Sequence, residues 1–141
     1  METPAQATVL VIEDDLAQRD LISLVLSRMF NYKVVCAGNG IDGLALYAEL
    51  HPSVIILDIL LPQMNGLDFL RQLRQENPKS DCAIFVISGL GYREVVQQAI
   101  ENGARDFMVK PFDIQILAQR VEEAINNLKL SADSEKPLGQ K

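Results

Sequence analysis

Residues 54–66, with the sequence VIILDILLPQMNG, decide the expected fold of this chain. The first four of these residues are apolar, which is typical of a strand that is buried on both faces of a parallel sheet. The strand ends at the carboxylate of Asp58, and Pro62 and Gly66 then mark a turn into a helical pattern that starts near Leu67. Asp58 is therefore expected at the carboxyl end of a central strand, where open α/β sheets bind their ligands.

The same alternation extends over the whole chain. Five expected strands cover residues 8–12, 33–37, 54–57, 83–87 and 106–109, and five expected helices cover residues 16–29, 41–50, 67–76, 92–101 and a last segment from a cap at Asp113 to about Lys129. Such alternation predicts βαβ units, a parallel sheet and helices on both of its faces. Right-handed crossovers then favour a flavodoxin-like (βα)5 three-layer sandwich with strand order 2-1-3-4-5.

The length and composition indicate one ordinary globular domain. The chain has 141 residues, of which 48% are hydrophobic and 23% charged. We expect an N-terminal extension over 1–6, the domain over 7–129, and a flexible tail or the start of a linker over 130–141, because that last segment is polar and holds Pro137 and Gly139. No apolar run is long enough to span a bilayer, and residues 1–7 lack the pattern of a secretory signal. A cytoplasmic location without a membrane partner is the resulting expectation.

The charge of the chain excludes one further class of partner. The net charge is −6, and there is no basic stripe and no DNA-reading motif, so we expect no nucleic acid bound by this domain. Cys36 and Cys82 lie far apart, with no histidine at metal-ligand spacing, and are expected to be reduced thiols in or near the core. His51, the only histidine, precedes Pro52, which favours a helix stop over a phosphohistidine.

Functional side chains follow four of the five expected strands. Glu13 and Asp14 follow the first, Asp58 ends the third, Ser88 follows the fourth and Lys110 follows the fifth. In the order 2-1-3-4-5 all of them gather at one edge of the sheet. Clustered carboxylates resist joint ionisation, and a divalent cation removes that conflict; oxygen ligands of this kind suit Mg²⁺. A carboxylate beside such an ion, a hydroxyl and an ammonium is equipped to accept a phosphoryl group.

Together these residues resemble the site of a CheY-like receiver domain of two-component response regulators. Glu13 and Asp14 take the place of the family's acidic pair, Asp58 of its phosphoacceptor, Ser88 of its switch hydroxyl and Lys110 of its lysine. The intervals between these positions match the usual intervals of the family. The resemblance covers about residues 7–129.

The resemblance implies a magnesium-dependent phosphoacceptor. Asp14 is expected to bind Mg²⁺ directly and Glu13 through water, with Asp58 and the backbone carbonyl of Leu60 as the other protein ligands. Asp58 would take its phosphoryl group from a sensor histidine kinase or a histidine phosphotransfer protein. The domain would then be a signalling switch of a His-Asp phosphorelay, and not an enzyme beyond its own phosphorylation and dephosphorylation.

The resemblance also implies how the switch works. Ser88 and Lys110 would contact the new phosphoryl oxygens, and Phe107, three residues before the lysine, would reorient. The surface formed by the fourth helix, the fifth strand and the fifth helix would then change its interaction with an output domain or protein, and the family also uses this face for homodimers. The bond before Pro111 is one that receivers often hold in cis.

Two residues depart from the commoner family pattern. Leu60 and Leu90 lie two residues after Asp58 and Ser88, where many relatives have polar side chains. These positions flank the path of the water that attacks the acyl phosphate. We therefore expect slow self-hydrolysis of the phosphoryl group.

Other interpretations make different demands on these residues. The acidic run 13–15 could be a solvated helix start, with Asp15 only the helix cap, and Phe107 could be a plain core residue. An aspartate-nucleophile phosphatase needs a second acid two residues after its nucleophile, where this chain has Leu60. A flavin-binding protein needs a phosphate loop after the first strand, where the acidic run would repel a phosphate. A receiver-like scaffold without phosphorylation would not need the full set of site residues.

Overall fold

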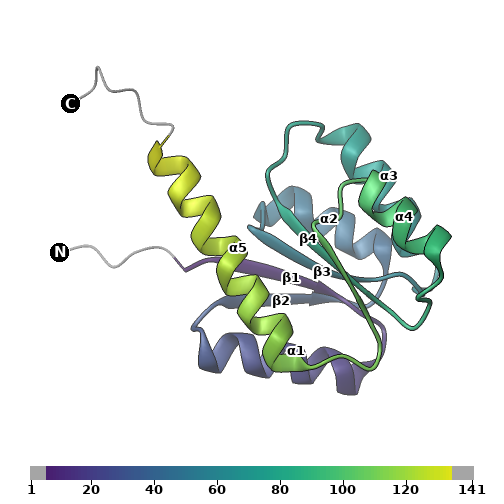
Figure 1. Ribbon diagram of the computed structural model, residues 1–141, viewed down its shortest axis with the longest axis horizontal. Coiled ribbons are helices and arrows are strands. Elements are labelled where there is room, and N and C mark those ends of the chain that lie inside the picture. Colours follow the sequence, from purple (N-terminus) through teal and green to yellow (C-terminus); the bar gives the residue numbers. More distant parts are fainter. Residues whose placement is uncertain (1–5, 135–141) are drawn as a thin grey trace.

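The chain folds as alternating strands and helices. The computed structural model describes residues 6–134. The strands are β1 (Thr8–Ile12), β2 (Lys33–Ala37), β3 (Val54–Asp58), β4 (Ala83–Ser88) and β5 (Asp106–Val109), and the helices are α1 (Leu16–Met29), α2 (Gly40–Leu50), α3 (Gly66–Glu76), α4 (Arg93–Glu101) and α5 (Ile114–Ser134). The element order predicted from the sequence is confirmed (Figure 1).

The five strands form one parallel sheet in the order β2-β1-β3-β4-β5, as predicted. The pairing register aligns the carboxyl ends of the central strands. Ile12 of β1 lies beside Leu57 of β3, and Asp58 lies beside Ile87 of β4. Because the strands are parallel and in this register, the side chains that follow them are brought to a single edge of the sheet.

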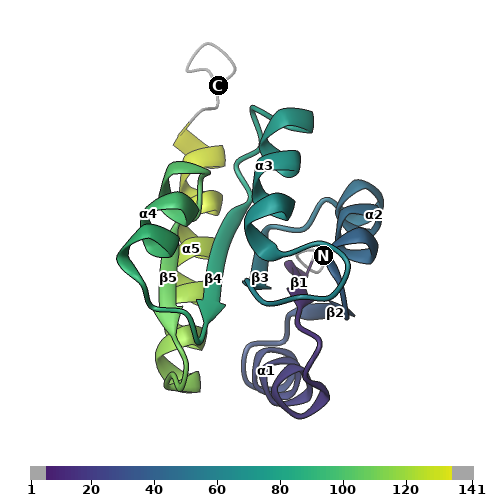
Figure 2. The ribbon, with the colours of Figure 1, turned by 90° about the vertical axis from the view of Figure 1, so that its right-hand side faces the viewer.

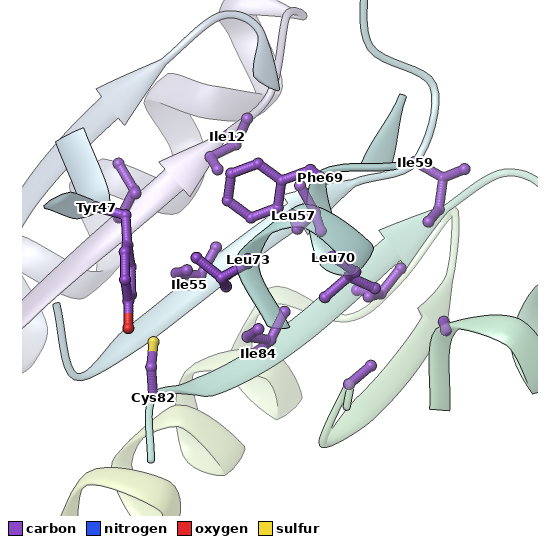
Figure 3. Close-up of a cluster of buried hydrophobic side chains, with 14 of the residues drawn as sticks. Ile12, Tyr47, Ile55, Leu57, Ile59, Phe69, Leu70, Leu73, Cys82 and Ile84 are labelled. Atoms are coloured by element: carbon purple, nitrogen blue, oxygen red, sulfur yellow. The ribbon is translucent and has the colours of Figure 1, made fainter. Parts of the chain in front are cut away.

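Helices cover both faces of the sheet, with α1 and α5 on one face and α2, α3 and α4 on the other (Figure 2). Every residue of β3 is buried, which is why its sequence is a continuous apolar run rather than an alternating one. On the α2–α4 face, Phe69 and Leu73 of α3 pack with Leu57 and with Tyr47 of α2 (Figure 3). The two apolar layers hold the strand ends rigidly in register.

Polar residues set the helix ends. Asp15 caps α1 by accepting a hydrogen bond from the backbone N of Gln18 at 3.0 Å, so the expected cap is confirmed. His51 is the C-cap of α2 in the left-handed conformation, with φ 47°, which confirms its helix-stop role. Gly66 starts α3 directly over the end of β3, where a Cβ atom would lie 2.5 Å from the Asp58 carbonyl oxygen. Only glycine fits this close approach.

The last helix is longer than predicted. It continues to Ser134, beyond the predicted helix end near Lys129. The domain boundary expected at residue 129 stays a prediction. Residues 131–134 have the sequence SADS, which includes no glycine or proline, and the first helix breaker of the segment is Pro137. Figure 1 shows the last turns of α5 projecting away from the body of the domain. The expected tail over 135–141 lies outside the described residues, as does most of the expected extension over 1–6.

The two cysteines are free thiols, with Cys36 half-buried and Cys82 buried, as expected. Burial raises the pKa of Cys82 to about 12, so this thiol stays protonated. Within residues 6–134, no helix is both long enough and apolar enough to cross a membrane.

Candidate functional site

The carboxyl edge of the sheet collects the buried polar side chains of the protein. Glu13, Asp58 and Ser88 are 0%, 3% and 0% exposed, and in the described part of the chain no other polar or charged residue is as buried. They come from the ends of β1, β3 and β4. Burying charged groups costs free energy unless they are paired, so the cluster marks this edge as the candidate site.

Lys110 connects two of these carboxylates. Its Nζ atom donates hydrogen bonds to Oε1 of Glu13 and to Oδ2 of Asp58, each at 2.9 Å. The backbone N of Lys110 donates to the Ser88 carbonyl at 2.8 Å, which fixes the lysine beside β4. The bond between Lys110 and Pro111 is cis, as the resemblance implied. A single ammonium therefore faces two buried acids and can balance the charge of only one of them.

The site strongly perturbs the protonation of Glu13. The pKa of Glu13 is raised to about 7, mainly by burial and also by the nearby Asp58, and the Lys110 ammonium only partly opposes these two effects. Burial alone would lower the pKa of Lys110, but its hydrogen bonds to Asp58 and Glu13 outweigh burial and raise it. Lys110 is therefore a permanent cation, whereas Glu13 changes its charge near neutral pH.

Three carboxylates are placed to share a cation. One oxygen each from Glu13, Asp14 and Asp58 lies within 4.8 Å of the other two. Asp14 is exposed while the other two are buried, so the cluster is open to solvent on one side. Carboxylate oxygens with access to water fit the ligand preference of Mg²⁺. The backbone N of Leu60 donates to Oδ1 of Asp58 at 3.3 Å, and this places the Leu60 main chain next to the cluster.

The two expected switch residues, Ser88 and Phe107, belong to β4 and β5. The hydroxyl of Ser88 accepts a hydrogen bond from the backbone N of Leu90 at 3.0 Å, and among the described residues no bond links it to Asp58. Phe107 is half-buried against the apolar cluster on the α2–α4 face. Phe107 thus packs with the core, and its switch role stays a prediction. Leu60 is 57% exposed and Leu90 is half-buried.

Sequence reasoning missed one contact of the site. It assigned Glu13 to a metal ion through water, but not to Lys110, which is 97 residues away in the chain. A long-range ion pair of this kind leaves no local signal in the sequence. The sequence could indicate only that the strand before Glu13 and the strand before Lys110 both end at the carboxyl edge of the sheet.

A cavity of about 430 Å³ lies at the opposite edge of the sheet and includes none of the site residues. Its wall includes Tyr47, His51 and Cys82. The acidic cluster is therefore separate from this cavity, and its member Asp14 is exposed to solvent.

A doubly wound α/β domain with an acidic cluster and a lysine at the carboxyl edge of its sheet has the architecture of a signalling receiver. The sequence model described as the response regulator receiver domain matches residues 9–122. The chain therefore belongs to the receiver domain family of two-component response regulators. The acidic cluster of Glu13, Asp14 and Asp58 is consistent with the phosphorylation site of such a domain.

Curated relatives include both short and long proteins. The chain is 34% identical to the chemotaxis protein CheY of Thermotoga maritima, over 85% of this chain and 95% of that protein. It is 36% identical to RpaA of Synechocystis, a DNA-binding dual master transcriptional regulator, over 80% of this chain but only 46% of that protein. The chain thus spans about half of one relative and nearly all of another.

Solved structures agree on the fold. A signal receiver domain from Vibrio parahaemolyticus superposes with a TM-score of 0.86 at 25% identity, covering 94% of this chain and all of that chain. The chemotaxis response regulator CheY4 of Vibrio cholerae gives a TM-score of 0.77 at 27% identity, over 85% of this chain and 99% of its own. The flavodoxin-like receiver fold is therefore confirmed.

Proposed function

We propose that this protein is a phosphorylation-dependent switch in a His-Asp phosphorelay, with Asp58 as the phosphoacceptor. The observation that carries the proposal is the position of Asp58, which is buried at the end of β3, bonded to Lys110 and within 4.8 Å of carboxylate oxygens of Glu13 and Asp14. The phosphoryl donor would be a sensor histidine kinase or a histidine phosphotransfer protein. We place this relay in the cytoplasm.

The residues present can support the transfer. A carboxylate oxygen of Asp58 attacks the phosphorus of a phosphohistidine, a P–O bond forms, and the P–N bond breaks with its electron pair left on the imidazole. Lys110, whose Nζ already lies 2.9 Å from Oδ2 of Asp58, neutralises charge on the transferred oxygens. Asp14, Asp58 and the Leu60 carbonyl, with Glu13 through water, would hold Mg²⁺. When bound, Mg²⁺ supplies further neutralisation of the phosphoryl oxygens.

The response would pass through the loop after β4. The Ser88 hydroxyl is the group expected to turn toward the phosphoryl oxygens, and its present bond to the Leu90 backbone ties it to the loop. Gly89 lies in this loop with open space beside it, since a Cβ atom there would meet nothing within 4 Å, and glycine permits a wide range of backbone conformations. Phe107 of β5 would adjust next to this loop.

The output surface would be the face of α4, β5 and α5. Large apolar side chains are exposed there, among them Ile100 of α4, Val109 of β5 and Ile116 of α5. Such residues support a surface that contacts an output domain, an output protein or a second copy of the chain. No nucleic acid is proposed as a ligand of this domain, because its net charge is −6.

Phosphorylation of Asp58 can be tested directly. The protein is incubated with acetyl phosphate and Mg²⁺, and its intact mass is measured. We expect one phosphate adduct in the wild type and none in Asp58→Asn or in the presence of EDTA. An adduct that persists in Asp58→Asn would show that another residue takes the phosphoryl group.

Turnover of external phosphoesters is not proposed. The position two residues after Asp58 is Leu60, whose side chain cannot donate a proton to a leaving group. The domain promotes only its own phosphorylation and dephosphorylation in this proposal. A phosphatase assay on a chromogenic phosphomonoester should therefore give no rate above that of Asp58→Asn.

A further inference from the structure

Arg74 joins three segments at the end of the sheet opposite to the acidic cluster. Its Nη2 donates to the Gly103 carbonyl at 2.9 Å, its Nε to the Asn102 carbonyl at 3.3 Å and its Nη1 to the Ser80 carbonyl at 3.3 Å. Asn102 is the C-cap of α4, and Ser80 lies in the loop that leads into β4. One side chain of α3 thus holds the end of α4 and the approach to β4.

The acceptors of Arg74 are all backbone carbonyls. None of the ion pairs among the side chains of residues 6–130 includes Arg74, although this side chain is half-buried. Carbonyls at the end of a helix carry partial negative charge, so α4 itself compensates the guanidinium. Gly103 makes room for it, since a Cβ atom there would lie 2.1 Å from Nε of Arg74. Gly103 also has φ +97°, which favours glycine.

The two ends of α4 are held very differently. Its fully buried residue, Ala99, is in the last turns, and Ala104 behind it is also buried. At the other end, Tyr92 makes no side-chain cap bond, and residues 91–94 are exposed. The carboxyl end of α4 is therefore anchored, while the amino end, which follows the Ser88 loop, has few restraints.

We propose that Arg74 is a positioning residue that makes the carboxyl end of α4 the fixed pivot of the switch. Phosphorylation at Asp58 then moves the Ser88 loop and the amino half of α4, and residues 102–105 stay in place. Because β5 begins at Asp106, this pivot also fixes the start of the strand that carries Phe107 and leads to Lys110. The inference rests on the proposed function, since it describes how the phosphorylated site is transmitted.

Amide hydrogen exchange, followed by NMR, tests the anchor. The reporters are the amides of Asn102, Gly103 and Ala104, which bond to carbonyls of α4. In Arg74→Met we expect these amides to exchange about tenfold faster or more, because the charged bonds that hold the helix end are lost. Arg71→Met is the matched control: Arg71 also lies on α3, but its hydrogen bonds go to the exposed side chains of Asp68 and of Gln98 on α4, not to backbone carbonyls at the helix end. In Arg71→Met the exchange rates of the three reporter amides should stay within about twofold of their wild-type values.

The pivot is tested with beryllium fluoride and Mg²⁺ as the phosphoryl mimic. In the wild type, the amides of Val95 and Val96 should change their exchange by about fivefold or more, while those of residues 102–104 stay within about twofold. In Arg74→Met the change should spread to residues 102–104. The rate at which acetyl phosphate phosphorylates Asp58 in Arg74→Met should stay within about twofold of the wild-type rate, since Arg74 lies at the opposite edge of the sheet.

Two results would overturn the inference. One is a wild-type response to the mimic that is as large at residues 102–104 as at Val95 and Val96. The other is an Arg74→Met protein whose reporters exchange as in the wild type. If Arg74→Met does not fold, Arg74→Lys, which keeps the charge but not the three-way contact, takes its place. If the wild type shows no Mg²⁺-dependent response to the mimic, the proposed function is contradicted instead. The comparison of exchange rates between Arg74→Met and the wild type without the mimic still tests whether Arg74 anchors the helix end.

Discussion

The ammonium of Lys110 lies 2.9 Å from Oε1 of Glu13, a carboxylate that is 97 residues away in the chain and completely buried. The same ammonium contacts Asp58 at the same distance. One cation thus faces two buried acids, with the third acid, Asp14, at the solvent side. Without a metal ion, the site carries more negative charge than Lys110 can compensate, and this imbalance determines several measurable properties.

Glu13→Gln should stabilise the metal-free protein at pH 8. The pKa of Glu13 is raised from 4.5 to about 7 in the folded state, so the folded protein binds this proton more tightly than the unfolded chain does. Stability from this group is therefore present below about pH 4.5 and is lost as the pH rises through about 7. The loss is at most roughly 3 kcal/mol, and glutamine avoids it.

The measurement is urea unfolding in EDTA at pH 8 and at pH 5. The free energy of unfolding of Glu13→Gln should exceed that of the wild type by about 1–3 kcal/mol at pH 8. The difference should shrink at pH 5, where Glu13 of the folded wild type holds its proton. A Glu13→Gln protein that is less stable than the wild type at pH 8 would mean that the pair with Lys110 outweighs burial.

Mg²⁺ should raise the melting temperature, because the three carboxylates are assembled only in the folded state. An ion present at about ten times its dissociation constant adds about 1.4 kcal/mol, which corresponds to a shift of roughly 3–6 °C for a domain of this size. Asp14→Asn should abolish most of the shift. Asp15→Asn is the matched control: it removes the same charge one residue away and keeps a side chain that can cap α1. Equal loss of the shift in both variants would argue for general charge screening.

The sheet order and most element boundaries were predictable, because the signals are local. The buried run of residues 54–57, the cap at Asp15 and the stop at His51 each follow from the neighbouring sequence. The gathering of acids at one edge then follows from strand order alone. The end of α5 was not predictable from composition, since a polar segment without a helix breaker can continue a helix that packing has already started.

The contacts of Lys110 and Arg74 could not be predicted. The pairing of Lys110 with Glu13 depends on the distances between strand ends, which the sequence pattern does not specify. Arg74 binds three backbone carbonyls, and every residue carries such a carbonyl, so no residue type marks the acceptors. For both side chains, the sequence shows a charge but not its partner.

Lys110→Met should destabilise the metal-free protein by about 3 kcal/mol at pH 8, because two buried carboxylates lose their cation. The loss should be smaller at pH 5, since removing the lysine raises the pKa of Glu13 further and the neutral acid needs no partner. Urea unfolding gives both values. Lys79→Met, on an exposed lysine in the loop before β4, should change stability by less than about 0.5 kcal/mol.

The double variant Lys110→Met with Glu13→Gln isolates the pair. If the contact is responsible, the stability that Glu13→Gln adds at pH 8 should differ between the Lys110→Met background and the wild type by about 1 kcal/mol or more, and be larger in Lys110→Met, where it removes one of two uncompensated carboxylates. Strict additivity of the two single changes would show that Lys110 acts through Asp58 alone.

The acyl phosphate on Asp58 should be long-lived, because Leu60 and Leu90 offer no hydrogen bond to an attacking water. Hydrolysis breaks the bond between phosphorus and the carboxylate oxygen after water attacks phosphorus, and a polar side chain beside that path would orient the water. We expect a lifetime longer than about one minute at neutral pH and room temperature. Leu60→Gln, at a side chain that is 57% exposed, should shorten it by about threefold or more without loss of folding.

Decay is followed by intact mass after removal of the phosphodonor. Met29→Gln provides the control, because Met29 is 67% exposed at the end of α1 and the same change in polarity there is far from Asp58. Its lifetime should match that of the wild type. A wild-type lifetime of seconds, or equal decay in Leu60→Gln and Met29→Gln, would show that the two leucines do not control the access of water to the phosphoryl group.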